Sequence, residues 1–95
     1  MSQFKIFVVE DDPWYGEMLK YNLSLNPDYE VELYDNAKEC LNNLYLKPDV
    51  ICVDYFLPDN SGAELFEQIK SRTPNLPVII ISGQEDISVV LDLLK

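Results

Sequence analysis

Acidic residues follow two apolar segments of this 95-residue sequence. Glu10, Asp11 and Asp12 come directly after the apolar segment 4–9, and Asp54 comes directly after a second one. If the two segments are neighbouring strands, their backbones lie about 5 Å apart and the carboxylates meet in one crevice. Carboxylates that close raise each other's pKa unless a cation lies among them. Glu10, Asp11 and Asp54 therefore form a candidate metal site.

The ligand types narrow the choice of metal. Carboxylate oxygens with no His or Cys beside them select Mg²⁺, Mn²⁺ or Ca²⁺ over zinc or copper. An open crevice with few protein ligands favours Mg²⁺, which keeps several waters and completes its shell with a phosphate oxygen. The spacing of an EF-hand loop is absent, which disfavours a dedicated calcium site. The alternative is that residues 10–12 only form a solvated helix start and that Asp54 only opens a loop.

Composition excludes several other kinds of site. Seventeen acidic residues against seven basic ones give a net charge of −10. This charge disfavours nucleic acid and anionic lipid as partners and favours cations or proteins with a basic face. The sequence contains no histidine, which removes histidine-based catalysis and histidine-bound zinc. Cys40 and Cys52 are too few and too far apart for a zinc cluster, so we expect both to fill core space.

Length and hydropathy predict one small domain, residues 1–95. The longest aliphatic run, 78–81, is far too short to cross a bilayer. The N-terminus lacks the charged-then-apolar layout of a signal peptide. We therefore expect a cytoplasmic protein.

Apolar runs alternate with segments of helical period along the whole chain. The runs predict four strands, at residues 4–9, 30–34, 50–54 and 78–81. The segments between them, and a last one over about 86–95, predict four helices. This βαβαβαβα order predicts an α/β fold, a doubly wound parallel sheet with helices on both faces. Ligands of such sheets bind beyond the carboxyl ends of the strands.

Three of the helices carry start signals. Asp12 before Pro13 predicts a capped first helix that ends near residues 26–28. Asn36 opens the second helix and Ser61 opens the third, each with Glu three residues later. The apolar residues at helical spacing are Trp14, Met18, Tyr21 and Leu25 in the first helix, and Ala37, Cys40, Leu41, Leu44 and Tyr45 in the second.

Three segments carry a family resemblance. Residues 6–13 (IFVVEDDP), 54–65 (DYFLPDNSGAEL) and 78–83 (VIIISG) resemble the opening, the phosphoacceptor loop and the fourth strand of response-regulator receiver domains. Each motif is weak alone, but all three occur in order and on the expected elements. The resemblance implies a flavodoxin-like receiver fold with strand order 2-1-3-4. It covers about four-fifths of a complete receiver domain, from its N-terminal end.

The resemblance implies a role for each acidic residue. Asp54 would accept a phosphoryl group from a phosphohistidine on a sensor histidine kinase or a His-phosphotransfer protein. Asp11, Asp54 and the backbone carbonyl of Phe56 would bind Mg²⁺ directly, with Mn²⁺ as a possible substitute. Glu10 would act through a metal-bound water.

Two further residues and the output follow from the same resemblance. Ser82 would hydrogen-bond a phosphoryl oxygen. Phe56 and Gly83 would also bind the phosphoryl group, and Gly83 would offer its N–H and an open approach to the phosphorus. The added charge would switch a protein-interaction surface in two-component signalling. Such a module is not a conventional enzyme, although it would assist its own phosphorylation and dephosphorylation.

Two other functions compete with this one. A pseudo-receiver would dock partners without being phosphorylated. A Mg²⁺ phosphohydrolase with an Asp nucleophile would carry a second acid two residues later, where this sequence has Phe56.

The sequence departs from the family at its C-terminal end. The family continues to a fifth strand and helix, with a lysine and an aromatic residue that complete the switch, whereas the sequence given stops at Lys95. Lys5, Lys47 and Lys70 lie too early in a strand or too near the far ends of helices to replace that lysine. We expect either a piece of a longer receiver, with an output domain possibly following, or a natural short form. An uncovered aliphatic strand 78–81 predicts a dimer, an exchanged element or marginal stability.

Overall fold

The computed structural model describes residues 3–55, 57 and 62–81. The elements in chain order are β1 (Phe4–Val9), α1 (Pro13–Ser24), β2 (Tyr29–Tyr34), α2 (Ala37–Asn42), a 3-10 helix η1 (Leu44–Leu46), β3 (Val50–Asp54), α3 (Gly62–Arg72) and β4 (Val78–Ile81). All four predicted strands are confirmed within a residue. The helix predicted over residues 86–95 and the predicted cap Ser61 lie outside the described residues.

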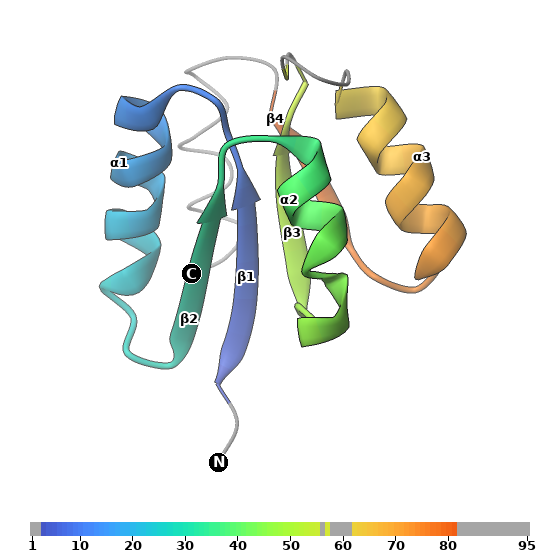
Figure 1. Cartoon of the computed structure of the whole chain (residues 1–95). Helices are drawn as coiled ribbons and strands as arrows, with labels where there is room; N and C mark the ends of the chain where they lie inside the picture. The colour runs from blue at the N-terminus through green and yellow to red at the C-terminus, as the bar shows by residue number, and fades with distance from the viewer. Residues whose placement is uncertain (1–2, 56, 58–61, 82–95) are drawn as a thin grey trace.

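The four strands form one parallel sheet in the order β2-β1-β3-β4, as expected. Helix α1 lies on one face of the sheet, and α2 and α3 lie on the other (Figure 1). The two central strands are buried on both faces, because alternate side chains of β1 and β3 point into different halves of the core. The predicted doubly wound architecture is confirmed.

Side-chain caps fix where the first two helices begin. The Asp12 carboxylate accepts hydrogen bonds from the backbone N–H groups of Trp14 (2.9 Å) and Tyr15 (3.3 Å). The Asn36 side-chain oxygen accepts one from the N–H of Glu39 (2.8 Å). Both predicted caps are confirmed, and each pairs N–H groups that a helix start leaves without an intrahelical partner.

Of the predicted apolar stripe of the first helix, only Met18 packs against the core, and it is partly buried. Trp14, Tyr21 and Leu25 are each about two-thirds exposed, at 67%, 67% and 65%. The helix instead packs through a second stripe, which consists of Gly16, Leu19 and Leu23. A Cβ at Gly16 would lie only 3.0 Å from the Leu33 side chain of β2, so the missing side chain is what lets the helix approach the sheet there.

The second helix is shorter than its apolar spacing predicted. It ends at Asn42, and the chain continues as the 3-10 turn η1. Lys47 then adopts a left-handed backbone conformation (φ 59°), which ends the turn before β3. Tyr45 is consequently 74% exposed and does not belong to the packed face.

Both cysteines lie in the core, as expected. Cys40 and Cys52 are fully buried and unpaired with each other. Burial raises the pKa of each thiol to about 12, so both remain neutral and unreactive at physiological pH.

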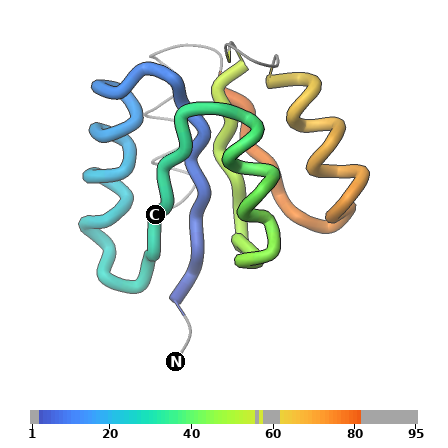
Figure 2. Tube along the Cα trace, viewed as in Figure 1, coloured from blue at the N-terminus to red at the C-terminus, as the bar shows by residue number. Residues whose placement is uncertain are grey.

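The parallel strands place their carboxyl ends together, next to the acidic residues of the candidate metal site. The Cα trace shows β1, β2 and β3 running in the same direction, so that their carboxyl ends meet at one edge of the sheet (Figure 2). Within the described part of the chain, no helix has the length and apolar character needed to cross a membrane.

Candidate functional site

Three carboxylates from two strands meet at this edge. Val9 of β1 pairs with Val53 of β3, so the residues that follow them, Glu10 and Asp54, stand side by side. Oxygen atoms from Glu10, Asp11 and Asp54 lie within 4.8 Å of one another. The predicted juxtaposition is confirmed, and it comes from strand register: a shift of one residue would turn these side chains to other faces.

The environment of Glu10 is that of a poorly solvated acid. Burial is the largest cause that raises its pKa, to about 8, and a side-chain hydrogen bond with Asp54 is the next. The negative charge of Asp54 adds to the shift, while the backbone N–H of Asp12, 3.3 Å from the Glu10 carboxylate, opposes it. Glu10 therefore holds a proton near neutral pH when no cation offsets the neighbouring carboxylates.

Asp12 has a different task from its two neighbours. Its carboxylate is occupied with capping α1, as described above. The alternative that residues 10–12 serve only as a helix start therefore holds for Asp12. Glu10 and Asp11 instead point their oxygens toward Asp54.

The donor set fits a hard divalent cation. All of its ligand atoms are carboxylate oxygens. Because the three acids are partly or fully exposed, water can fill the remaining positions of the coordination shell. A divalent ion would also offset the contribution that the neighbouring carboxylates make to the raised Glu10 pKa, because it places positive charge among them. Glu10, Asp11 and Asp54 could thus hold Mg²⁺. The predicted carbonyl ligand of Phe56 lies outside the described residues.

A glycine closes the loop that follows Asp54, and the sequence analysis did not single it out. The N–H of Gly62, at the start of α3, donates a hydrogen bond to the Tyr55 carbonyl (2.6 Å). A Cβ at Gly62 would lie 2.5 Å from the Tyr55 Cα and 2.6 Å from the Asp54 carbonyl oxygen. Only glycine allows the helix start this close to the backbone of the candidate phosphoacceptor.

The neighbouring strand β4 ends beside Asp54. Ile81 is the register partner of Asp54, and its carbonyl accepts a hydrogen bond from the Tyr55 N–H (2.8 Å). Ser82 and Gly83, the predicted phosphoryl-binding residues, follow Ile81 directly in sequence but lie outside the described residues.

An acidic groove next to the cluster was also not predicted. It has a volume of about 480 Å³ and lies between the starts of α1 and α2, beyond the carboxyl end of β2. Its lining residues are Glu10, Asp11, Pro13, Glu17, Leu33, Tyr34, Asp35 and Glu39. The signal in the sequence is that acidic residues follow β2 as well as β1 and β3, at Asp35 and Glu39.

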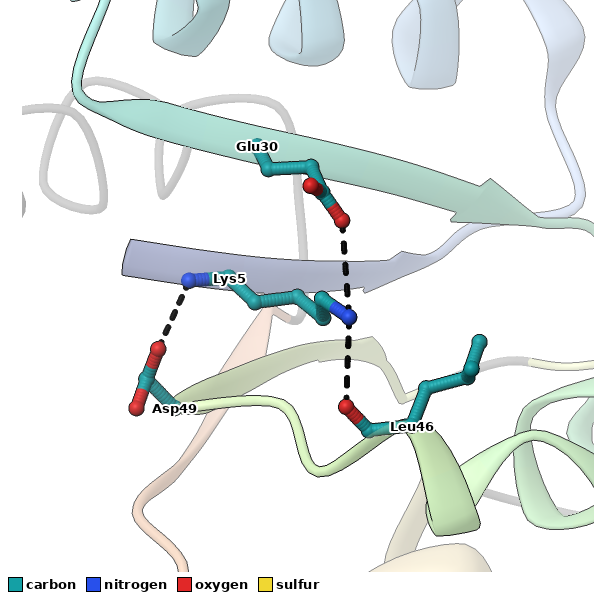
Figure 3. Close-up of polar contacts among 4 residues, drawn as sticks. All are labelled: Lys5, Glu30, Leu46 and Asp49. Atoms are coloured by element: carbon teal, nitrogen blue, oxygen red, sulfur yellow. Dashed lines mark hydrogen bonds and ion pairs between the residues drawn. The ribbon is translucent and has the colours of Figure 1, made fainter. Parts of the chain in front are cut away.

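Lys5 lies at the opposite end of β1, as expected from its place in the sequence. Its ammonium group is 3.5 Å from the Glu30 carboxylate and donates a hydrogen bond to the Leu46 carbonyl at 3.2 Å (Figure 3). Its backbone N–H donates to the Asp49 carboxylate at 2.7 Å. Lys5 thus ties β1 to its neighbours and does not serve the carboxylate cluster.

Comparisons with known proteins agree with this architecture. Residues 6–95 match the family described as "Response regulator receiver domain". Response regulator MprA of Mycolicibacterium vanbaalenii is 32% identical over 85 residues, which are 88% of this chain and 36% of that protein. The transcriptional regulatory protein KdpE of Staphylococcus aureus is 34% identical over 93 residues, which are 97% of this chain and 39% of that protein.

A solved structure shows the same fold. The non-phosphorylated HemR receiver domain from Leptospira biflexa superposes with a TM-score of 0.75 at 30% identity, and covers 94% of this chain and 74% of its own. The chain therefore belongs to the response regulator receiver domains, the α/β modules of two-component signalling. It spans less than two-fifths of the length of the two curated relatives.

Proposed function

We propose that Asp54 accepts a phosphoryl group from a phosphohistidine of a partner protein, in a reaction that depends on Mg²⁺. The observation that carries this proposal is the convergence of Glu10, Asp11 and Asp54 at one strand edge of a receiver fold. The absence of histidine from these 95 residues fits a donor imidazole that belongs to another protein. A sensor histidine kinase or a His-phosphotransfer protein is the matching class of donor.

The chemistry assigns a distinct task to each acid. A carboxylate oxygen of Asp54 attacks the phosphorus as the bond to the donor nitrogen breaks, and the imidazole keeps that electron pair and takes up a proton. When bound, Mg²⁺ would supply the positive charge that lets two anions approach each other. Asp11 and Asp54 would hold the ion directly, together with the Phe56 carbonyl, and Glu10 would hold it through water. Gly62, which has no Cβ, lets the start of α3 lie against the Asp54 backbone.

The remaining predicted site residues complete the proposal. Ser82 would donate a hydrogen bond to a phosphoryl oxygen, and Gly83 would contribute its N–H. The phosphoryl group adds about −1.5 to −2 charges, so movement of Ser82 toward it would shift the segment after β4. The output is a changed protein-interaction surface, and the module is a signalling domain that assists its own phosphorylation and dephosphorylation, not a conventional enzyme.

The proposal also includes the partners of the domain and its location in the cell. Response regulators work with histidine kinases and often carry an output domain, which would follow residue 95. We place the protein in the cytoplasm, where such kinases present their phosphohistidine. Direct binding of nucleic acid or membrane by this domain is disfavoured by its net charge of −10.

The decisive experiment is phosphorylation by a small phosphodonor, read by intact mass. With Mg²⁺ the chain should gain one phosphoryl group, and Asp54→Asn should abolish the gain. Asp49→Asn is the matched control, because Asp49 precedes the same strand but lies at its other end. Labelling that survives Asp54→Asn would place the acceptor elsewhere. A wild-type chain that takes up neither the phosphoryl group nor beryllofluoride would be a pseudo-receiver, which docks partners without phosphorylation.

A further inference from the structure

The groove between the starts of α1 and α2 has no task in the proposed phosphoryl transfer. Its lining residues all lie between positions 10 and 39, and the structure describes every one of them. The two helix starts flank the carboxyl end of β2, an outer strand of the sheet (Figure 1). The groove volume of about 480 Å³ lies within the range of ligand pockets, about 300–1,000 Å³, and is far larger than a bare metal ion needs.

Hydrogen bonds and packing hold the walls of this groove in place. The Glu10 N–H donates to the Tyr34 carbonyl at 2.9 Å, which joins the ends of β1 and β2. The side-chain caps described above fix the starts of α1 and α2. The Tyr34 ring packs edge-on against Phe7, with 4.9 Å between the ring centroids, and the Leu33 side chain lies close to Gly16 of α1. The groove is therefore preformed in the folded chain.

The lining combines apolar surface with carboxylates from separate elements. Pro13, Leu33 and the Tyr34 ring supply apolar surface. Glu17 of α1 and Glu39 of α2 supply exposed carboxylates on opposite walls. None of the lining residues is basic. The groove thus offers an apolar floor and a negative rim.

These two properties together select the chemistry of an occupant. A bare cation would meet the carboxylates but leave the apolar floor in contact with water, and an anion would be repelled. A second copy of this chain is a poor match, because it has seven basic residues against seventeen acidic ones. An arginine side chain fits both parts: its aliphatic stem packs on apolar surface, and its planar guanidinium donates hydrogen bonds to carboxylates.

We propose that this groove binds an arginine-bearing segment of a partner protein. The groove shares two acids with the metal cluster, so Glu17, Asp35 and Glu39 remain for the guanidinium when Mg²⁺ is bound. A partner held in the groove would lie beside the cluster that contains Asp54. The inference goes beyond the proposed function and does not depend on phosphoryl transfer, because it needs only the shape and the charge of the groove.

The test is a titration of the Mg²⁺-loaded chain with a short synthetic peptide of arginine and leucine, followed through the backbone amide signals by NMR. The signals of Asp35 and Glu39 should shift in a saturable manner. Exposed charge pairs are weak, so we expect a Kd of about 1 mM that rises with salt concentration. A peptide with citrulline in place of arginine keeps the shape but lacks the charge, and it should leave these signals unchanged.

A pair of substitutions on opposite walls localises the binding. Glu17→Gln combined with Glu39→Gln should weaken peptide binding about fivefold. Both side chains are exposed and neither belongs to the metal cluster, so folding and phosphorylation by a small donor should be unchanged. Asp28→Asn combined with Glu67→Gln is the matched control, because it removes the same number of exposed charges before β2 and in α3. It should leave the peptide affinity unchanged.

Several results would overturn the proposal. They are the absence of a saturable shift, equal binding of the citrulline peptide, equal weakening by the two double variants, or shifts centred on the exposed face of α1 around Tyr21. Displacement of the peptide by excess Mg²⁺ at constant ionic strength would identify the groove as a cation site instead. Phosphorylation of Asp54 is measured separately with a small donor that needs no docking, so failure of one proposal is distinguishable from failure of the other.

Discussion

The two ends of the sheet differ in how their charged side chains are arranged: opposite charges are paired at one end, and acids are grouped at the other. At the amino ends of the strands, the Lys5 ammonium group faces Glu30, and the Lys5 backbone N–H donates a hydrogen bond to the Asp49 carboxylate (Figure 3). The Lys5 carbonyl in turn accepts a hydrogen bond from the Asp49 N–H. At the carboxyl ends, two acids, Glu10 and Asp54, lie side by side and share a hydrogen bond. Burial, together with this neighbouring acid, raises the pKa of Glu10 to about 8. The first arrangement stabilises the fold. The second arrangement lowers the free energy of unfolding, because neighbouring acids repel each other when they ionise. Such clusters of acids are typical of sites that bind a ligand.

The largest expected effect comes from filling the space behind Asp54. Gly62→Ala places a Cβ against backbone atoms at 2.5–2.6 Å, so either α3 or the Asp54 backbone must move. We expect a loss of about 2–3 kcal/mol in the free energy of unfolding, together with weaker Mg²⁺ binding. Chemical denaturation and a Mg²⁺ titration measure the two effects.

Gly16→Ala is the matched control for this change. Its Cβ would meet the Leu33 side chain at 3.0 Å, and a side chain can shift more easily than backbone. It should cost less stability than Gly62→Ala and leave Mg²⁺ binding unchanged. Equal effects of the two substitutions on Mg²⁺ binding would contradict a special role for Gly62.

The next effect is a pH dependence confined to the carboxyl end. The folded-state pKa of Glu10 (about 8) lies above its ordinary value of 4.5, so the folded protein binds this proton more tightly than the unfolded chain. Without Mg²⁺, stability should fall as pH rises from about 5 to about 8, by roughly 2 kcal/mol after allowance for solvent at this partly exposed group. Thermal unfolding in chelator measures it.

Glu10→Gln and added Mg²⁺ should each flatten this dependence. The amide cannot ionise, and the cation offsets the carboxylate charge. A slope that persists in Glu10→Gln would show that other groups cause it.

The smallest effect is expected at the amino end. Lys5→Met removes a partly exposed ion pair with Glu30 and one hydrogen bond to the Leu46 carbonyl. Such exposed contacts contribute about 0.5–1 kcal/mol. Denaturation should show this modest loss, with Mg²⁺ affinity and phosphorylation unchanged. An effect of Lys5→Met on either activity would remove the contrast between the two ends.

The fold was predictable because its signals are local. Apolar runs marked the strands, and Asp12 and Asn36 marked helix starts through hydrogen bonds to residues two or three positions away. The meeting of Glu10, Asp11 and Asp54 followed from the rule that parallel strands share one carboxyl edge.

Features that depend on tertiary distance were not predictable. Helix α1 carries two apolar stripes, and spacing alone could not show that Leu19 and Leu23, not Trp14 and Tyr21, face the sheet. The need for glycine at position 62 arises from a backbone contact with Tyr55 and Asp54 that only the folded chain makes.

A Mg²⁺ titration followed through the fluorescence of Trp14, the single tryptophan, tests the metal site most directly. The backbone N–H of Trp14 donates a hydrogen bond to the carboxylate of Asp12, which follows Asp11. We expect a saturable change in fluorescence at millimolar Mg²⁺, with an affinity that is higher at pH 8 than at pH 6 because Glu10 loses its proton. Asp54→Asn should weaken the binding, whereas Asp49→Asn should not. No saturable change at either pH, or equal affinities of the wild-type and Asp54→Asn chains, would contradict a metal site formed by these carboxylates.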